Sequence, residues 1–272
     1  MRRMFWMGIA MALCLLTLHL AGSGEPADAR ADESTAKPAT GFLYKTIDFG
    51  GKTYPFSVFV PPDYTPERAW PAILSLHGMG ERGSDGFFQT DIGIGRAIRR
   101  NYRRCPAIVV MPQCPVDQTW DGAMLDLAIK CLEASSHEYY LDPQRVYLTG
   151  LSMGGAGSWR LAARMPNAFA AVVPICGFYG SYKDRNEPEA LAAAAEQLAR
   201  MPIWTFHGSA DPAVPVERTR EIVKAVRAAG GQIKYKEFPE VGHNVWDRAY
   251  DNPDMWRWMF SQRRETGTPA TP

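Results

Sequence analysis

Short apolar runs alternate with longer amphipathic stretches along most of the chain. The central runs, such as residues 107–111 and 170–175, are almost continuous in alanine, valine and isoleucine. This pattern is typical of strands that are buried on both faces, and the stretches between them have the 3.6-residue period of helices. Such alternation predicts an α/β fold with a mostly parallel sheet and helices on both of its faces.

The predicted strands and helices follow from this pattern and from the glycine and proline residues that interrupt it. The expected strands are residues 43–49, 55–60, 71–76, 107–111, 146–149, 170–175, 203–206 and 233–238. The expected helices are residues 92–102, 122–135, 152–165, 188–200, 216–229 and 253–262. The first two strands differ from the rest because polar and apolar residues alternate in them, with Gly50 and Gly51 between. They are expected to form an antiparallel hairpin at the sheet edge.

The N-terminus has the layout of a secretory signal. Arg2 and Arg3 precede an apolar stretch at residues 4–20, and small residues follow it. We expect a signal peptide over 1–23, with a later cut after Ala29 left open, followed by a flexible linker over 24–40. The folded domain is then expected over 41–262, with a disordered tail over 263–272. A secreted or periplasmic location follows, although the apolar stretch is also about long enough to remain as a membrane anchor.

Composition limits the partners of this domain. The chain has 272 residues, of which 46% are hydrophobic and 22% charged, and these values are close to those of soluble globular proteins. Lys and Arg number 30 against 29 Asp and Glu, which gives a formal net charge of +1. No bulk field draws the protein to nucleic acid or to an anionic membrane. We therefore expect no nucleic-acid partner, and no stable membrane partner unless the signal is left uncleaved.

Four cysteines remain once the signal is removed, and they allow three full pairings. Cys105 and Cys114 flank one predicted strand, which holds them too far apart for a disulfide. A core of this size needs no covalent link, so buried free thiols are favoured over disulfides.

The strongest chemical signal is the segment 150–155, GLSMGG, which follows a predicted strand and opens a predicted helix. This is the context of a nucleophile elbow, in which glycines on both sides of Ser152 permit a tight turn. The serine hydroxyl then stands above the sheet edge. Ser152 is the expected nucleophile.

A serine hydroxyl needs a base, and the base needs an orienting carboxylate. His243 follows the last predicted strand beside a glycine and is the expected base. His207 ends an earlier strand, too early for the chain order of serine, acid, histidine that this fold uses. His137 lies upstream of the serine and is interpreted as a surface residue.

The expected acid is Asp211, which lies just beyond the strand at 203–206 and before a helix. It is therefore placed at the carboxyl edge of the sheet, where open α/β folds bind ligands. A plain turn aspartate before a proline is the alternative for this residue. Three residues in the loop after the sixth strand are alternative candidates for the acid: Asp184, Glu187 and Glu189.

Acyl transfer also requires donors for the oxyanion, usually backbone N–H groups. The loop 76–83, LHGMGERG, follows the third strand, and its glycines let the backbone approach a substrate. The expected oxyanion hole consists of the N–H groups of Met79 and Met153. His77 is interpreted as a residue that shapes this loop. Trp120 is a candidate wall of the substrate pocket, with a core position as the alternative.

These motifs resemble those of the α/β-hydrolases over residues 42–260. More narrowly, the chain is similar to the esterase and predicted-peptidase branch near the phospholipase/carboxylesterases, dienelactone hydrolases and polyhydroxybutyrate depolymerase-like or feruloyl esterases. The segments that carry the resemblance are 60–64 (VPPDY), 76–83, 111–115 (MPQCP), 150–155, 207–211 (HGSAD) and 242–243. The resemblance implies an eight-stranded, mostly parallel sheet and a triad of Ser152, Asp211 and His243. It does not transfer a substrate.

The sequence therefore predicts an exported serine hydrolase that cleaves carboxylic esters through an acyl-enzyme, with no cofactor and no metal. No connection is long enough for a cap domain, so an open site is expected. Such a site suits small esters or acyl groups attached to polysaccharide. Two alternatives remain: a serine peptidase of the prolyl oligopeptidase type, and an inactive hydrolase-fold protein that serves as a binding module.

Overall fold

The computed structural model describes residues 38–180 and 188–264. The expected signal peptide, nearly all of the expected linker and residues 265–272 of the expected tail lie outside these ranges. Among the described residues, no helix is both long and apolar enough to cross a membrane.

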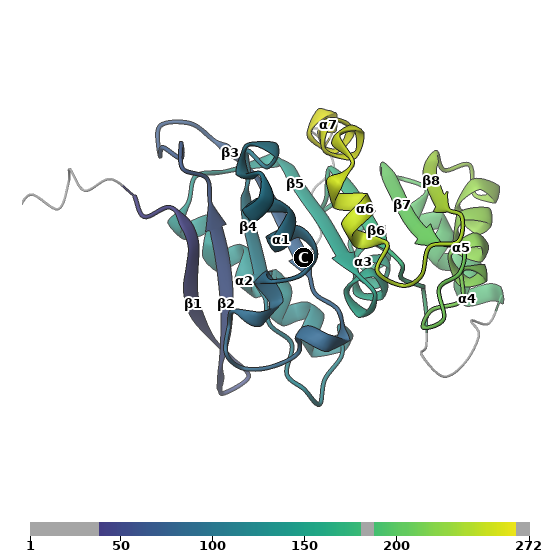
Figure 1. The fold of residues 1–272 in the computed structure, drawn as a ribbon, viewed down its shortest axis with the longest axis horizontal. Helices are drawn as coiled ribbons and strands as arrows, with labels where there is room; N and C mark the ends of the chain where they lie inside the picture. The colour runs from purple at the N-terminus through teal and green to yellow at the C-terminus, as the bar shows by residue number, and fades with distance from the viewer. Residues whose placement is uncertain (1–37, 181–187, 265–272) are drawn as a thin grey trace, which may run out of the picture. The chain divides into compact units, whose positions relative to one another are not determined.

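Eight strands and seven α-helices alternate along the described chain (Figure 1). The strands are β1 (Gly41–Phe49), β2 (Lys52–Val60), β3 (Trp70–Leu76), β4 (Ile108–Pro112), β5 (Leu141–Leu151), β6 (Ala171–Ile175), β7 (Ile203–Gly208) and β8 (Ile233–Phe238). The α-helices are α1 (Gly93–Arg100), α2 (Gly122–Glu138), α3 (Met153–Arg164), α4 (Pro188–Leu198), α5 (Glu217–Ala228), α6 (Trp246–Asp251) and α7 (Pro253–Ser261). Short 3-10 helices are η2 (Met79–Glu81), η3 (Phe88–Thr90) and η4 (Tyr102–Arg104).

All eight strands form one open sheet in the order β1-β2-β4-β3-β5-β6-β7-β8. The pairs β1·β2 and β2·β4 are antiparallel, and every other pair is parallel. The turn of the edge hairpin has φ +57° at Gly50 and +76° at Gly51, which suits the mirror-image turns of tight hairpins. The predicted fold class and edge hairpin are confirmed.

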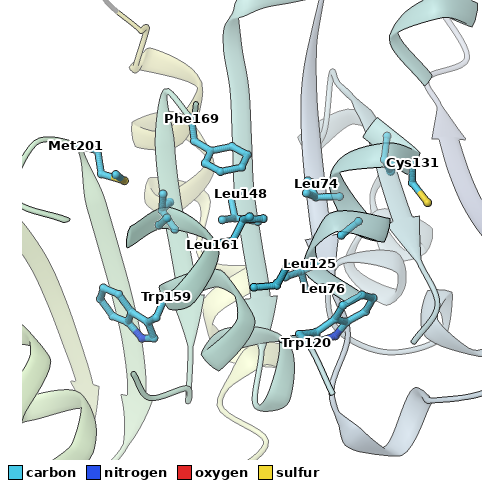
Figure 2. Close-up of a cluster of buried hydrophobic side chains, with 14 of the residues drawn as sticks. Leu74, Leu76, Trp120, Leu125, Cys131, Leu148, Trp159, Leu161, Phe169 and Met201 are labelled. Atoms are coloured by element: carbon cyan, nitrogen blue, oxygen red, sulfur yellow. The ribbon is translucent and has the colours of Figure 1, made fainter. Parts of the chain in front are cut away.

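Two hydrophobic clusters hold the layers together, one on each face of the sheet. Helices α2, α3, α4 and α5 contribute to the larger cluster, and α1, α6 and α7 contribute to the other. Figure 2 shows part of the larger cluster, in which Trp120, Leu125 and Trp159 lie with Leu74 and Leu148 of the central strands. Because each α-helix of residues 38–180 and 188–264 packs on the sheet, none of them forms a cap over its edge.

The structure also contains elements that the sequence pattern did not predict. Strand β5 begins at Leu141 instead of residue 146, and its pairing with β3 shifts register between Trp70 and Ala72. Helix α6 begins three residues after His243 and is only six residues long. Helix α6 follows the loop that carries His243. The start of β5 lies at the opposite end of that strand from Ser152.

Candidate active site

Three predicted residues meet at the carboxyl edge of the parallel strands. Ser152 follows β5, Asp211 follows β7 and His243 follows β8. Nε2 of His243 lies 2.8 Å from Oγ of Ser152, and Nδ1 lies 2.7 Å from Oδ2 of Asp211. The serine hydroxyl donates to Nε2, and the Nδ1–H group donates to the carboxylate. The three side chains therefore form one hydrogen-bonded relay.

The turn at Ser152 has the geometry of a strained elbow. Ser152 has φ 53° and ψ −115°, in a region that residues other than glycine rarely adopt. Its backbone N–H donates to the carbonyl of Ile175 at 2.9 Å, which holds the elbow against β6. A Cβ at Gly154 would lie 1.9 Å from the carbonyl oxygen of Leu76, and one at Gly150 would lie 2.3 Å from the carbonyl oxygen of Gly154. Only glycine allows the chain to pass so close to itself at these positions.

Asp211 is held by donors on both of its oxygens. Oδ1 accepts from the backbone N–H groups of Ala213 and Val214, each at 2.9 Å. Its side chain has no exposed surface. Burial alone would raise the pKa of this carboxyl, but hydrogen bonds from His207, His243 and the two backbone groups hold that pKa well below its ordinary value. Asp211 is thus a fixed, ionised acceptor for His243.

The loop that carries His243 is tied to the loop that carries Asp211. The N–H of Ala210 donates to the carbonyl of Val241 at 3.0 Å. A Cβ at Gly208 would lie 2.2 Å from the same carbonyl oxygen, so β7 approaches the histidine loop closely. The ring of Trp246 stands edge-on to the imidazole of His243, with the ring centroids 5.4 Å apart. These contacts set the position of the base before a substrate arrives.

The two expected oxyanion donors each begin a helix. Met79 is the first residue of η2, and Met153 is the first residue of α3. N–H groups in the first turn of a helix have no partner within that helix, so both are available to an anion. A Cβ at Gly78 would lie 3.6 Å from Cβ of Ser152, which places the η2 loop directly beside the nucleophile.

Trp120 does not line an open pocket, which corrects one alternative of the sequence analysis. Its exposed fraction is 0%, and its indole Nε1–H donates to the carbonyl of His77 at 2.9 Å. The ring lies edge-on to the His77 imidazole at 5.1 Å between centroids. Trp120 is therefore a core residue that anchors the start of the oxyanion loop.

His77 shapes this loop from inside, as expected. Its Nε2 accepts from the N–H of Cys114 at 2.9 Å, so its Nδ1 carries the hydrogen that points to the Gly78 carbonyl at 2.6 Å. Burial lowers the pKa of His77 to about 4, and the ring is neutral near pH 7. Glu81 completes the anchor, because its Oε2 accepts from the N–H of Gly78 at 2.8 Å.

Of the alternative candidates for the acid, the structure describes only Glu189, and this residue does not contact the relay. Glu189 is exposed in the first turn of α4. Asp184 and Glu187 lie outside the described residues.

The sequence analysis missed two residues of the site. His207 is too early in the chain for the expected order of serine, acid and histidine, yet its Nε2 lies 3.1 Å from Oδ2 of Asp211. The four-residue spacing from His207 to Asp211 at the end of one strand is the signal that could have identified it. Cys176 follows β6 with φ +40°, is buried and has a pKa well above its ordinary value because of that burial. Nothing in its sequence context marks it as a neighbour of the serine.

The thiol of Cys176, the carboxylate of Asp211 and a ring nitrogen of His243 lie within 4.8 Å of one another. Such a group has the donor types that bind a transition metal. However, both Asp211 oxygens and both His243 nitrogens already take part in hydrogen bonds within the protein. We therefore assign Asp211 and His243 to the relay, and Cys176 is a buried neighbour of these two residues.

Comparison with known proteins places this site within one family model. Residues 101–254 match the model described as the dienelactone hydrolase family. The matched range includes Ser152, Asp211 and His243, whereas the oxyanion loop at 76–83 precedes it.

The chain is also similar to individual proteins, among them two curated relatives and one solved structure. The chain is 25% identical over 205 residues to a bifunctional acetylxylan esterase/xylanase of Neocallimastix patriciarum, covering 74% of this chain and 27% of that protein. It is 25% identical over 202 residues to a secreted protein of Arthroderma benhamiae, covering 65% of this chain and 21% of that protein. The chain thus spans only about a quarter of the length of these two curated relatives. The crystal structure of a thermostable esterase aligns with TM-score 0.71 and 33% identity, over 82% of this chain and 63% of that one.

Proposed function

Because the chain belongs to the dienelactone hydrolase family, within the α/β-hydrolases, we propose that it is a serine hydrolase of carboxylic esters. The observation that carries the proposal is the relay from Ser152 through His243 to Asp211, with contacts of 2.8 and 2.7 Å, on a strained elbow. A merely structural serine needs neither an aligned imidazole nor a positive φ angle.

The proposed reaction has two halves. In the first, Oγ of Ser152 attacks the ester carbonyl carbon while Nε2 of His243 takes the hydroxyl proton. The resulting imidazolium is stabilised by Asp211, which stays ionised. The oxyanion accepts from the N–H groups of Met79 and Met153. Collapse of the tetrahedral intermediate breaks the bond to the alcohol oxygen, which takes the proton from His243.

The second half returns the free enzyme. Water attacks the acyl carbon of the Ser152 ester, and His243 removes a proton from that water. The second tetrahedral intermediate expels Oγ of Ser152, which regains its proton from His243. One ester and one water molecule have then become one acid and one alcohol.

The substrate proposed is a small ester or an acyl group attached to polysaccharide. The description of one relative as an acetylxylan esterase supports this class. A site at the sheet edge supports it as well, since the described helices pack on the sheet faces. Export from the cell is proposed with it, on the N-terminal signal pattern and on the description of one relative as secreted.

The test is a panel of substrates for the chain from Gly24 onward: aryl esters of rising acyl length, acetylated xylan, methyl ferulate and a prolyl peptide amide. We expect ester turnover in the native chain and its loss in Ser152→Ala. Cleavage of the peptide amide without ester turnover would instead support the peptidase alternative. No turnover of any substrate, with no covalent labelling of Ser152, would support the inactive binding module.

A further inference from the structure

A second histidine lies on the far side of the Asp211 carboxylate from the reaction centre. His207 is the penultimate residue of β7, and none of its side chain is exposed. Its Nε2 lies 2.9 Å from the carbonyl oxygen of Val214 and 3.1 Å from Oδ2 of Asp211. Both oxygens can only accept, so Nε2 carries a hydrogen.

The orientation of this ring is fixed from its other side as well. Nδ1 of His207 lies 2.7 Å from Oγ1 of Thr219 on α5. The same hydroxyl oxygen lies 2.9 Å from the carbonyl oxygen of Gly177, just beyond β6. Thr219 is itself fully buried. The imidazole is thus held between the acid loop and a helix, with its Nε2–H directed at the acid loop.

Oδ2 of Asp211 consequently lies between two imidazole rings. His207 approaches it at 3.1 Å and His243 at 2.7 Å, while Oδ1 takes two backbone N–H groups. Orienting His243 requires only the second of these contacts. The first contact therefore calls for a separate explanation.

We propose that His207 is a positioning residue of the relay, which fixes the Asp211 carboxylate and draws charge from the oxygen that Asp211 offers to His243. The inference rests on the function proposed above. His207 touches no reacting atom and acts only through Asp211. Its effect is on how strongly Asp211 stabilises the imidazolium form of His243.

The sign of this effect follows from charge. A donor on Oδ2 reduces the negative charge that stabilises protonated His243, so removing the donor raises the pKa of His243. The acid limb of kcat/KM against pH then moves to higher pH, because the base must be neutral to take the serine proton.

Among the described residues, few other charged or titratable groups face this pair. Glu237 of β8 lies opposite His207 in the strand register. Nε of Arg220, on α5, donates to Oε2 of Glu237 at 3.0 Å. Cys176 at the end of β6 faces Asp211, and burial keeps its thiol protonated. None of these groups changes charge between pH 5 and 8.

Two substitutions separate positioning from simple packing. The amide nitrogen of His207→Gln falls near the position of Nε2 and can still donate to Asp211. The shorter His207→Asn reaches only the Thr219 side, where Nδ1 lies, and loses the contact with Asp211. The two variants remove the same ring and differ in the donor that the proposal requires.

The measurement is the pKa of His243, followed by NMR on protein with 15N-labelled histidine, together with the pH profile of ester hydrolysis. We expect His207→Asn to raise the pKa of His243 by about one unit, so that kcat/KM on the acid limb falls about tenfold. His207→Gln should stay close to the native value. An unchanged His243 pKa in folded His207→Asn, or an equal shift in both variants, overturns the proposal.

The native protein supplies a test that needs no folded variant. The 15N signals of His207 show whether Nε2 carries a hydrogen: the proposal requires this hydrogen, and its absence overturns the proposal. Because NMR requires no turnover, a native chain that hydrolyses no ester would refute the proposed function while the role of His207 is still decided.

Discussion

At the scale of single residues, the site depends on groups that are fixed before substrate binds. Both carboxylate oxygens of Asp211 accept hydrogen bonds, and the His243 ring is hydrogen-bonded to both Asp211 and Ser152. Preorganised groups of this kind avoid reorganisation during the reaction, which is the main source of electrostatic catalysis. The chemistry therefore depends on hydrogen-bond geometry as much as on residue type.

The role of Asp211 can be tested by removing its charge and little else. We expect Asp211→Asn to lower kcat by about 10⁴-fold with KM little changed, because the amide favours the wrong tautomer of His243. Steady-state kinetics on an aryl ester measure both constants. The matched control is Asp142→Asn, which should retain native kcat because Asp142 lies at the end of β5 away from Ser152. Activity within tenfold of native in folded Asp211→Asn would remove Asp211 from the relay.

His77 predicts a pH dependence of stability. Its pKa is about 4 in the folded protein against 6.5 for the ordinary side chain, so between these values the unfolded chain binds the additional proton. The free energy of unfolding should then fall as the pH falls from 6.5 to 4, by on the order of 3 kcal/mol. Denaturant titrations across this range measure the slope.

The comparison variant is His77→Gln, whose amide oxygen can accept from the N–H of Cys114. Its stability should lack the part of the slope that His77 contributes between pH 4 and 6.5. The same slope in both proteins would show that His77 is not the group responsible.

At the scale of elements, the elbow between β5 and α3 is the most constrained part of the chain. The apolar run before Ser152 and the glycines around it were sufficient to predict this turn. The bounds of β5 were not predictable, because Asp142 and Pro143 at its start are residues that strands disfavour. Both residues fall between the paired positions Leu141 and Val146, where the register with β3 shifts in a way that depends on tertiary packing.

The other local misses have similar causes. Helix α6 has six residues, too few to show a helical period in the sequence. The role of Trp120 depends on its contact with the His77 carbonyl, and that of His207 on its contact with the Asp211 carboxylate. Residue spacing in the sequence does not reveal either contact. The meeting of Ser152, Asp211 and His243 was predictable, because the fold determines their chain order and places each of them after a strand end.

Close approach at the elbow predicts the effect of one added methyl group. A Cβ at Gly154 would meet backbone oxygens of Leu76 and His77 at 1.9 and 2.6 Å, and backbone cannot move aside easily. We expect Gly154→Ala to destabilise the protein by about 3 kcal/mol or to prevent folding. Gly80→Ala is the control, since nothing lies within 4 Å of its Cβ position. Thermal melts of the two variants decide the matter, and equal melting temperatures would contradict this packing.

At the scale of the whole molecule, hydrophobic clusters on the two faces of the sheet hold the described residues together, and no disulfide joins any of these residues. Among the described residues, all four cysteines are free and buried, in agreement with the favoured sequence prediction: Cys105, Cys114, Cys131 and Cys176. Burial raises the pKa of the first three to about 12, so the thiolate that would react is nearly absent at neutral pH.

A thiol titration tests this description of the core. The chain from Gly24 onward, without reductant, should react slowly with a disulfide reagent while native. It should show four thiols after denaturation in guanidinium. Pre-treatment with reductant should leave its melting temperature unchanged. Fewer than four thiols after denaturation would reveal a disulfide that the structure does not contain.

Covalent labelling can show whether His243 activates Ser152 as a nucleophile. The native chain would be incubated with a fluorophosphonate at pH 7.5, and the adduct located by peptide mass spectrometry in the native protein and in His243→Ala. We expect rapid, stoichiometric modification of Ser152 in the native chain and labelling at least about a thousandfold slower in the variant. An unmodified Ser152 in folded native protein, or a labelling rate independent of His243, would show that His243 does not activate Ser152.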